Sequence, residues 1–411
     1  MANVSSSNGL EKRPKLRFPG FDEPYKQCRI GDIYAERSQR GASDMELLSV
    51  TMNDGVMPRS EIEGKDNSSE DKSNYKVVLT GDMVYNSMRM WQGANGISPC
   101  DGIVSPAYTV LMPKIPISNG YFAAFFKSPN LINEFRKNSQ GMTSDTWNLK
   151  YPQIETIKVC IPALSEQNRV ADMLRTLERR IEKQAQLVDN LKKYKRGLSS
   201  SLFDEISKSG CPTVSFADGF RLLQNNTFSR DDLSYDVGDV RNIHYGDVLI
   251  KYGTVTDIGA LSVPCIKPDR DIEKFSSSSY LRNGDIVFAD TAEDYTVGKA
   301  TEIVGVTNQR VLSGLHTIPC RPHDRFAPMF LGHYFNSYHF RRQIYRMIQG
   351  IKVSSISKSE IAKTTILTPP YDVQRKVASV LSEVDHLIEK EAETVIVLQK
   401  IRRGLLQQLF I

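Results

Sequence analysis

The sequence predicts an α+β protein made of two similar halves, in which two mixed α/β domains are separated by two long helices that pair as an antiparallel coiled coil. Three observations carry this prediction. They are an internal repeat spaced by half the chain, a strict heptad pattern inside each copy, and short strand candidates bounded by turn residues between the copies. The expected architecture is therefore a pseudo-two-fold internal repeat.

The repeat aligns residues 161–203 with residues 368–410 without a gap, and 17 of the 43 aligned positions are identical. Identical positions include Gln167 and Gln374 near the start of each copy and the RGL and LF groups at its end. Duplication followed by divergence of the intervening segments accounts for this pattern. Each half is then one variable domain followed by one repeated segment.

Each copy of the repeat carries apolar residues at alternating steps of four and three, which is the pattern of a coiled-coil seam. The predicted seam consists of Val170, Leu174, Leu177, Ile181, Val188, Leu191, Leu198 and Leu202 in the first copy, and of Val377, Leu381, Val384, Ile388, Val395, Leu398, Leu405 and Leu409 in the second. Polar residues interrupt both copies at the same places, Gln184 and Lys195 in the first, Glu391 and Arg402 in the second.

A helix of about 39 residues is roughly 58 Å long, too long to bury its apolar stripe on one compact domain. We therefore expect the two helices to pack on each other. Antiparallel pairing is favoured because it relates the two domains by an approximate two-fold axis. The alternative is that each helix packs on its own domain or pairs with a second chain.

The expected domain bounds follow from these segments. Residues 1–15, rich in Ser, Asn and Lys, are a disordered lead-in. They are followed by the first variable domain (16–160), the first repeated helix (161–210), the second variable domain (211–367) and the second repeated helix (368–411). A fainter repeat, QGMTSDTWNLKYPQIETIKVCIP (140–162) with QGIKVSSISKSEIAKTTILTP (349–369), closes each variable domain.

Composition indicates a globular chain, with 40% hydrophobic and 25% charged residues among 411. No segment has the 18 or so consecutive apolar residues of a membrane span, and the N-terminus lacks the apolar stretch of a signal peptide, so we expect a soluble cytoplasmic protein. The formal net charge of +5 permits a polyanionic partner without requiring one.

The sequence shows no catalytic or metal centre. The six cysteines are far apart and the six histidines have no metal-binding spacing. TPPY (368–371) differs from the NPPY signature of amino-methyltransferases at its first residue, VGKA (297–300) lacks the rest of a P-loop, and PDRDIEK (268–274) lacks the spacing of a nuclease motif. We therefore predict a chain that is not an enzyme and holds no cofactor or metal.

Over nearly its full length the chain resembles the specificity subunit of Type I restriction-modification enzymes. The resemblance is carried by LRFPGF (16–21), by the two repeat segments that begin IPALSEQ and TPPYDVQ, and by phrases of the variable domains. These phrases are LLSVTMNDGV (47–56), YNSMRMWQGANGISPCDGIVSPAYTVL (85–111), FADTAEDYTVGKATEI (288–303) and LSGLHT (312–317). One departure is Val373, which stands where the family has a Glu, as Glu166 does in the first copy; we expect little effect.

The resemblance implies a non-catalytic subunit with a role in phage defence in a bacterial or archaeal cytoplasm. Its variable segments would be target recognition domains, each reading one half of a bipartite, asymmetric DNA sequence, and its helices a spacer that sets the gap. It implies as partners double-stranded DNA, two modification subunits that carry S-adenosylmethionine, and often two restriction subunits that use ATP and Mg²⁺. Diverged halves on a pseudo-two-fold scaffold fit the approximate dyad of duplex DNA.

DNA contacts are predicted from side-chain chemistry and position. In the first domain they are Asn86, Arg89, Trp91, Gln92 and Gly93, and in the second Lys251, Tyr252, Thr291, Glu293, Asp294, Tyr295 and Lys299. Arg can donate two bonds to guanine, Asn or Gln can pair with adenine, Glu or Asp can accept from cytosine, and Gly93 and Gly96 would let the backbone approach closely. The alternatives are a core position for Trp91, a phosphate contact or a solvated charge for Arg89, and solvation for the acidic pair.

The repeated helices offer two further surfaces. The basic runs KKYKR (192–196) and QKIRR (399–403) either contact DNA phosphates or form a solvated face. The exposed faces beyond the seam are where we expect modification subunits to dock. Two rival functions are a structural coiled-coil adaptor without DNA specificity and a part of a fused restriction-methylase.

Overall fold

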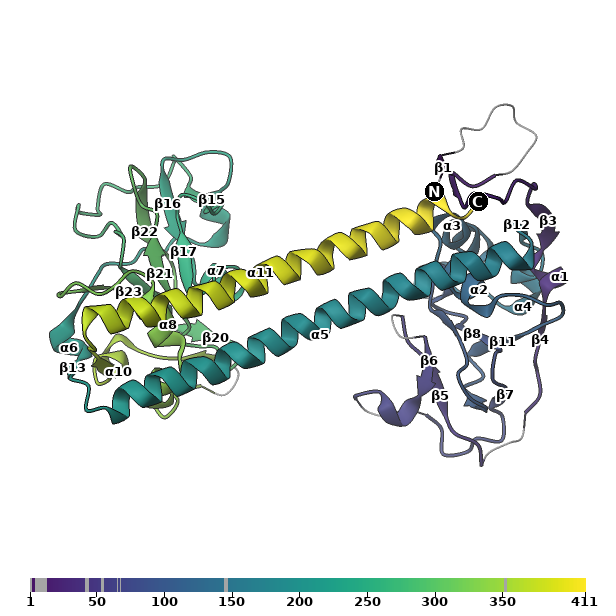
Figure 1. The fold of residues 1–411 in the computed structure, drawn as a ribbon, viewed down its shortest axis with the longest axis horizontal. Coiled ribbons are helices and arrows are strands. Elements are labelled where there is room, and N and C mark those ends of the chain that lie inside the picture. The colour runs from purple at the N-terminus through teal and green to yellow at the C-terminus, as the bar shows by residue number, and fades with distance from the viewer. Residues whose placement is uncertain are drawn as a thin grey trace. The chain divides into compact units, whose positions relative to one another are not determined.

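A computed structural model describes residues 2–3, 13–40, 44–52, 55–64, 66, 68–143, 147–350 and 353–411. The chain divides into two compact units (Figure 1). Unit 1 comprises residues 1–185 and 393–411, and unit 2 comprises residues 186–392. Each unit therefore holds one variable domain together with part of both long helices. Of the predicted lead-in, residue 1 and residues 4–12 lie outside the described residues.

Unit 1 is built on a four-stranded antiparallel sheet with the order β4-β11-β8-β9. These strands are β4 (Tyr34–Glu36), β11 (Tyr108–Pro113), β8 (Met83–Asn86) and β9 (Asn95–Ile97). Two-stranded antiparallel pairs surround it: β1 (Ala2–Asn3) with β2 (Leu16–Arg17), β3 (Lys26–Arg29) with β12 (Lys158–Ile161), β5 (Leu48–Val50) with β6 (Val56–Pro58), and β7 (Lys76–Val78) with β10 (Gly102–Val104). The short helices are α1 (Ile30–Ile33), α2 (Asn119–Phe125), α3 (Pro129–Asn138) and α4 (Tyr151–Ile154), with 3-10 turns η1 (Arg59–Glu61) and η2 (Met90–Gln92).

Unit 2 is built on a five-stranded sheet with the order β14-β23-β19-β21-β17. These strands are β14 (Phe220–Leu222), β23 (Thr317–Pro322), β19 (Ile286–Ala289), β21 (Ala300–Val304) and β17 (Val255–Asp257). A second sheet has the order β15-β18-β16-β22, from β15 (Leu233–Ser234), β18 (Cys265–Ile266), β16 (Val240–Ile243) and β22 (Arg310–Ser313). Two strand pairs are β13 (Thr213–Ser215) with β25 (Thr365–Leu367) and β20 (Thr291–Ala292) with β24 (Ser354–Ser355). The helices are α6 (Phe216–Gly219), α7 (Tyr245–Ile250), α8 (Phe330–Asn336), α9 (Tyr338–Ile344) and α10 (Lys358–Ile361), with a 3-10 turn η4 (Arg230–Asp232).

The central sheets of the two units follow the same plan. In chain order, β4, β8, β9 and β11 of unit 1 correspond to β14, β19, β21 and β23 of unit 2, and each set is joined in the same spatial order. In both units two helices follow the last of these strands, α2 and α3 in unit 1, α8 and α9 in unit 2. Unit 2 adds β17 at the edge of its sheet, paired parallel to β21. The internal repeat thus extends to the framework of domains whose sequences have diverged.

The two long helices are α5 (Leu164–Lys208) and α11 (Tyr371–Gln408). Helix α5 continues five residues beyond the aligned repeat, which ended at Phe203, until Gly210 takes a left-handed conformation at φ +77°. All sixteen predicted seam residues are buried or half-buried. Other apolar residues of the same helices, such as Val397 and Ile401, are exposed. The heptad pattern therefore separates the covered face of each helix from its open faces.

In each unit the end of one long helix packs near the beginning of the other. In unit 1 Leu409, directly after α11, belongs to the same apolar cluster as Val170 of α5. In unit 2 Leu202 of α5 packs against the cluster that contains Val377 of α11. Within each unit the two helices therefore run antiparallel, which is the orientation predicted from the sequence.

The phenylalanine that closes each copy of the repeat lies in an aromatic core. In unit 2 Phe203 lies against Phe330 and Tyr334 of α8, with ring centroids 5.9 and 5.3 Å away. In unit 1 Phe410 lies against Tyr121 and Phe125 of α2, at 5.2 and 5.3 Å. Phe203 and Phe410 are fully or almost fully buried, at 0% and 3% exposure, so the closing LF group of each repeat completes a domain core.

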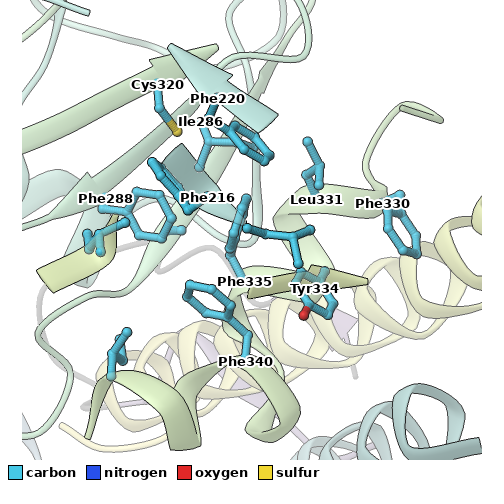
Figure 2. Packing of buried hydrophobic residues seen from close by; sticks show 14 of the residues in the cluster. Phe216, Phe220, Ile286, Phe288, Cys320, Phe330, Leu331, Tyr334, Phe335 and Phe340 are labelled. Carbon is cyan, nitrogen blue, oxygen red and sulfur yellow. The ribbon is translucent and has the colours of Figure 1, made fainter. Parts of the chain in front are cut away.

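Figure 2 shows the unit 2 core in which α8 and α9 meet the central sheet. Phe335 of α8 lies between Phe288 of β19 and Phe340 of α9, with centroid separations of 4.9 and 4.7 Å. Edge-on packing of this kind fixes the angle at which the helices cover the sheet. The core therefore holds the loop that leaves β19 in a defined position.

The repeated glutamines join each long helix to its own domain. Gln167 accepts a hydrogen bond from the Ser118 backbone N–H at 3.0 Å and donates to the Pro162 carbonyl at 3.0 Å. Gln374 accepts from the Ala327 N–H at 2.8 Å and donates to the Pro369 carbonyl at 2.8 Å. Both side chains are buried. This shared function gives a physical reason for their identity in the repeat.

The position of Glu166 is used differently in the two halves. Its buried carboxylate accepts two bonds from Arg17, at 2.9 and 2.8 Å, and a third from Tyr25. Arg17 lies in the LRFPGF segment, so this ion pair holds that segment on α5. In the second copy Val373 packs beside the apolar cluster instead.

Candidate nucleic-acid interface

Except for Lys251 and Tyr252, which follow α7, the residues predicted to contact DNA lie in or next to corresponding loops of the two units. The first loop joins β8 to β9 and the second joins β19 to β21. Each loop is closed by the same backbone hydrogen bond, from Asn86 N–H to the Ala94 carbonyl at 3.0 Å and from Ala289 N–H to the Lys299 carbonyl at 2.9 Å. Gly93 and Gly298, at φ +88° and +78°, precede these closures. We call these segments the recognition loops, residues 87–94 and 290–299.

The first recognition loop contains the 3-10 turn η2 and presents Arg89 and Gln92 to solvent. Gly93 is buried, and a Cβ there would lie 3.2 Å from Ile132. Gly96 is buried too, and its Cβ would lie 2.7 Å from Gly55. These glycines permit close packing inside the domain.

Trp91 and Asn86 hydrogen-bond to the backbone of the first recognition loop. The Trp91 indole is half-buried, packs edge-on against Trp147 at 5.3 Å and donates to the Met88 carbonyl at 3.1 Å. The Arg136 guanidinium lies 5.7 Å from its ring. The Asn86 side chain accepts from the Met88 N–H at 3.0 Å. Both side chains thus hold the backbone at Met88, which leaves Arg89 and Gln92 as the outward polar groups.

The second recognition loop exposes an acidic and aromatic tip, formed by Glu293, Asp294 and Tyr295. Tyr295 is 81% exposed. Asp294 accepts from the Thr296 N–H at 2.8 Å and from its hydroxyl, and these hydrogen bonds lower the pKa of the Asp294 carboxyl. The carboxylate therefore stays ionised and the turn is fixed by the side chain itself.

Two residues predicted in this set lie inside the domain. Tyr252 is 1% exposed, so its ring is unavailable to a partner. Lys299 donates to the Leu249 and Tyr252 carbonyls at 2.8 and 3.0 Å, and burial lowers the pKa of its ammonium group. Both side chains were expected to point into solvent. Tyr252 is instead buried, and the Lys299 ammonium points towards carbonyl groups of α7 and of the residues that follow it.

The remaining two predicted residues are Lys251, which follows α7, and Thr291, which lies near the start of the second recognition loop. The exposed Lys251 ammonium lies 4.8 Å from the Tyr235 ring and donates to the Ser262 carbonyl at 2.6 Å. Thr291 is half-buried and donates to Asp290 at 2.8 Å. Lys251 therefore keeps an exposed charge while tying two loops of unit 2 together.

The sequence prediction missed a backbone element beside each recognition loop. In unit 1 Gln140 and Asn148 exchange hydrogen bonds at 2.9 and 2.8 Å, and in unit 2 Gln349 and Ser355 do so at 3.0 and 2.8 Å. The chain just after each bridge bonds to the recognition loop, from Leu149 N–H to the Ser87 carbonyl and from Ile356 N–H to the Asp290 carbonyl. The faint repeat that begins with QG was the signal for this element, because the same backbone closure is needed in both halves.

A cavity of about 780 Å³ in unit 2 joins the second recognition loop to the helix pair. It is lined by Asp294, Tyr295 and Lys299 together with Lys195 and Asp385 of the long helices. Of the basic run 192–196, Lys195 forms an ion pair with Asp385, while the other four residues are exposed. Among the described residues, no group of His, Cys, Asp or Glu has the arrangement of a metal site. None of the described helices is long and apolar enough to cross a membrane.

Comparisons with known proteins identify what this chain resembles. Residues 23–193 match the family described as the Type I restriction modification DNA specificity domain. The MjaX type I restriction enzyme specificity subunit of Methanocaldococcus jannaschii is 26% identical over 198 residues, which cover 47% of this chain and 42% of that protein. The matched part thus spans less than half the length of this curated relative.

Solved structures with the same fold cover nearly the whole chain. One is a chain from work on complex assembly and conformational transition of the type I R-M system, with a TM-score of 0.58, 15% identity, and coverage of 95% of this chain and 98% of that one. Another is the S subunit of a Type I restriction-modification system from M. genitalium, with a TM-score of 0.52, 12% identity, and coverage of 97% and 99%. The HsdS subunit from Thermoanaerobacter tengcongensis has a TM-score of 0.50, 15% identity, and coverage of 96% and 97%.

Proposed function

Because residues 23–193 of this chain belong to the Type I restriction modification DNA specificity domain family, we propose that the protein is the DNA-recognition subunit of a Type I restriction-modification complex. In this role it is not itself an enzyme. It reads a bipartite, asymmetric DNA sequence and positions the subunits that act on it.

One observation from the structure carries this proposal. The same loop in each unit, held by the same backbone closure, presents different chemistry at its tip. Arg89 and Gln92 suit guanine and adenine in the major groove, and Glu293 or Asp294 can accept from the cytosine amino group. Equivalent scaffolds with unlike tips are what two different half-sites require.

The helix pair serves as the spacer in this proposal. A long helix has a fixed rise per residue, so a spacer made of α5 and α11 would fix the gap between half-sites in base pairs. The helix faces beyond the seam dock two modification subunits, which carry S-adenosylmethionine. Two restriction subunits that use ATP and Mg²⁺ complete the larger complex.

Expression with the neighbouring modification subunit tests the proposal. The host lacks adenine methylation, and methyladenine is mapped across its genome by long-read sequencing. We expect one split motif with a fixed gap. Absence of methylation, with a purified complex and an intact cofactor site in the partner, would instead support a coiled-coil adaptor without DNA specificity.

A further inference from the structure

In each unit an ion pair between described residues joins the two long helices. In unit 2 the Lys195 ammonium of α5 lies 2.5 Å from the Asp385 carboxylate of α11. In unit 1 the Arg402 guanidinium of α11 lies 2.8 Å from the Glu178 carboxylate of α5. The four side chains are 19%, 29%, 31% and 47% exposed, respectively. Lys195, Asp385 and Arg402 are therefore half-buried beside the apolar seam, while Glu178 is exposed.

The two ion pairs are copies of each other in the internal repeat. Lys195 and Arg402 are the second polar interruption of the heptad pattern in their respective copies, and Glu178 and Asp385 are likewise at aligned positions. The two residue numbers also have the same sum in both pairs, as a single antiparallel register requires. The repeat therefore places a cation and an anion on each helix so that both find partners at once.

The aliphatic seam alone does not fix this register. Its residues are Leu, Ile or Val at nearly every step, so a slip of one heptad would again face aliphatic residues with aliphatic residues. The charged residues break this degeneracy. In either slipped register Lys195 would face Ala378 or Ala392, and Asp385 would face Val188 or Leu202.

The second ion pair gives the same result. After a one-heptad slip Arg402 would face Ala171 or Ala185, and Glu178 would face Val395 or Leu409. In parallel, in-register pairing Lys195 would instead meet Arg402, a like charge. Each of these alternatives breaks both observed ion pairs, while the observed register pairs all four charged side chains.

We propose that Lys195–Asp385 and Glu178–Arg402 are the contacts that select the antiparallel register of the helix pair. Their main effect is specificity of pairing, because an ion pair beside a seam adds little stability compared with an apolar pair of similar size. Asp385 also accepts from Thr254 at 3.1 Å, so in unit 2 the same carboxylate fixes the recognition domain to the selected register.

The selected register also places Phe410 and Phe203 in the cores of units 1 and 2. In unit 1 it brings Phe410 onto Phe125, and in unit 2 it brings Phe203 onto Tyr334. A slip of one heptad would displace these rings by about 10 Å along the helix. The inference rests on the proposed function only in one respect, namely that a single register gives a single gap in the DNA target.

The experiment is a charge-exchange cycle on the full chain without DNA or partners, so its outcome is independent of DNA recognition. The variants are Lys195→Asp, Asp385→Lys and the double exchange. Carbodiimide treatment, which joins a contacting amine and carboxylate, followed by mass spectrometry reads the register. Thermal unfolding reads the stability. Arg175→Glu is the matched control, because Arg175 is 63% exposed and pairs only within α5, with Asp172.

In the wild type we expect residue 195 to be cross-linked to residue 385. Each single exchange should abolish this cross-link and lower Tm by about 5 °C or more, since like charges then meet beside the seam. The double exchange should restore both, with amine and carboxylate interchanged, and the control should stay within about 1 °C. A wild-type cross-link from Lys195 mainly to Glu391 or Glu393 would overturn the register.

A second set of variants separates specificity from stability. Replacing all four charged residues with Leu removes the proposed selection but keeps the apolar seam. We expect Tm to be unchanged or raised, while the hydrogen exchange of α5 and α11 becomes heterogeneous, with more than one protected population. A fall in Tm with a single exchange population would show that the ion pairs only stabilise the helices, and would reject the proposal.

Discussion

Arg89 is the exposed cation of the first recognition loop, and neighbouring side chains fix the backbone next to it. The Trp91 and Asn86 side chains hydrogen-bond to the backbone of Met88, the residue before it. Arg89→Ala should relax specificity at one position of one half-site and cost about 1–3 kcal/mol in specific binding, because a forked contact to guanine is lost. The measurement is binding by the assembled complex to DNA series in which each half-site is varied separately. Arg175→Ala, an exposed arginine on α5, serves as control.

An equal loss of affinity on specific and non-specific DNA would contradict this role for Arg89. Such a loss, with a reduced salt dependence, is the behaviour of a phosphate contact.

His333 gives the protein a pH-dependent contribution to stability. Its side chain is 1% exposed, and burial together with the nearby Lys195 ammonium lowers its pKa to about 4, against the opposing effect of Asp385. Because the unfolded imidazole has a pKa near 6.5, the neutral folded form stabilises the protein fully above pH 6.5. This stability is lost as the pH falls towards 4, by about 3 kcal/mol.

His333→Gln should therefore flatten the fall in unfolding free energy between pH 6.5 and 4, measured by urea denaturation. His323→Gln, at an exposed position, should leave the wild-type slope unchanged. Burial raises the pKa of Glu302 to about 7, which gives a slope of opposite sign, so the test compares each variant with the wild type at the same pH. A His333 variant that retains the wild-type slope would contradict the assignment.

Side-chain direction is where prediction from the sequence was least successful at the residue scale. Loop residues were chosen by chemistry, and Arg89, Gln92 and Tyr295 are exposed, whereas Tyr252 and Lys299 point inward. A loop carries no periodicity that distinguishes its two sides. The inward direction of Lys299 is set by carbonyl groups of the α7 region, a long-range contact that no local pattern encodes.

At the scale of elements, the long helices were the most predictable feature. A two-residue error at either end hardly affects a seam of ten heptad positions, so the periodicity identified the covered face of α5 and α11. The repeat alignment stops at Phe203, but α5 continues to Lys208, near residue 210 where the first repeated helix was expected to end. The strands, mostly three to five residues long, leave too little pattern to predict their order.

Replacing the phenylalanine that closes each repeat should destabilise one unit only. Phe410→Ala removes a ring from the core around Tyr121 and should destabilise unit 1 by about 3–5 kcal/mol. Hydrogen exchange should then increase in α2, with little change in α8. Phe203→Ala should have the reverse effect, which makes each variant the control for the other. Equal loss of protection in both units by either variant would show that the cores are not independent.

At the scale of the whole molecule, the duplication was evident from the sequence but the topology of the domains was not. The common sheet order of the two units joins strands far apart in sequence, and the parallel β17–β21 pair in unit 2 has no counterpart in the central sheet of unit 1. Non-local pairing of this kind is set by the packing of the complete domain.

Lengthening the spacer tests the proposed ruler. Seven residues with the heptad pattern are inserted after Ala185 and seven after Ala392, where the chain passes from one unit to the other, so both interhelix ion pairs are kept. The insertions add about 10.5 Å, or roughly three base pairs at 3.4 Å each. The methylation map should show unchanged half-sites with the gap increased by this amount. An unchanged gap, or altered half-sites, would contradict the ruler.

The reciprocal placement of the helix ends also determines when each domain can mature during synthesis. Phe203, which belongs to the core of unit 2, is translated before the second variable domain and is therefore present when that domain folds. The core of unit 1 lacks Phe410 until the second variable domain has been translated. The first variable domain to be translated thus completes its core only after the second has been made.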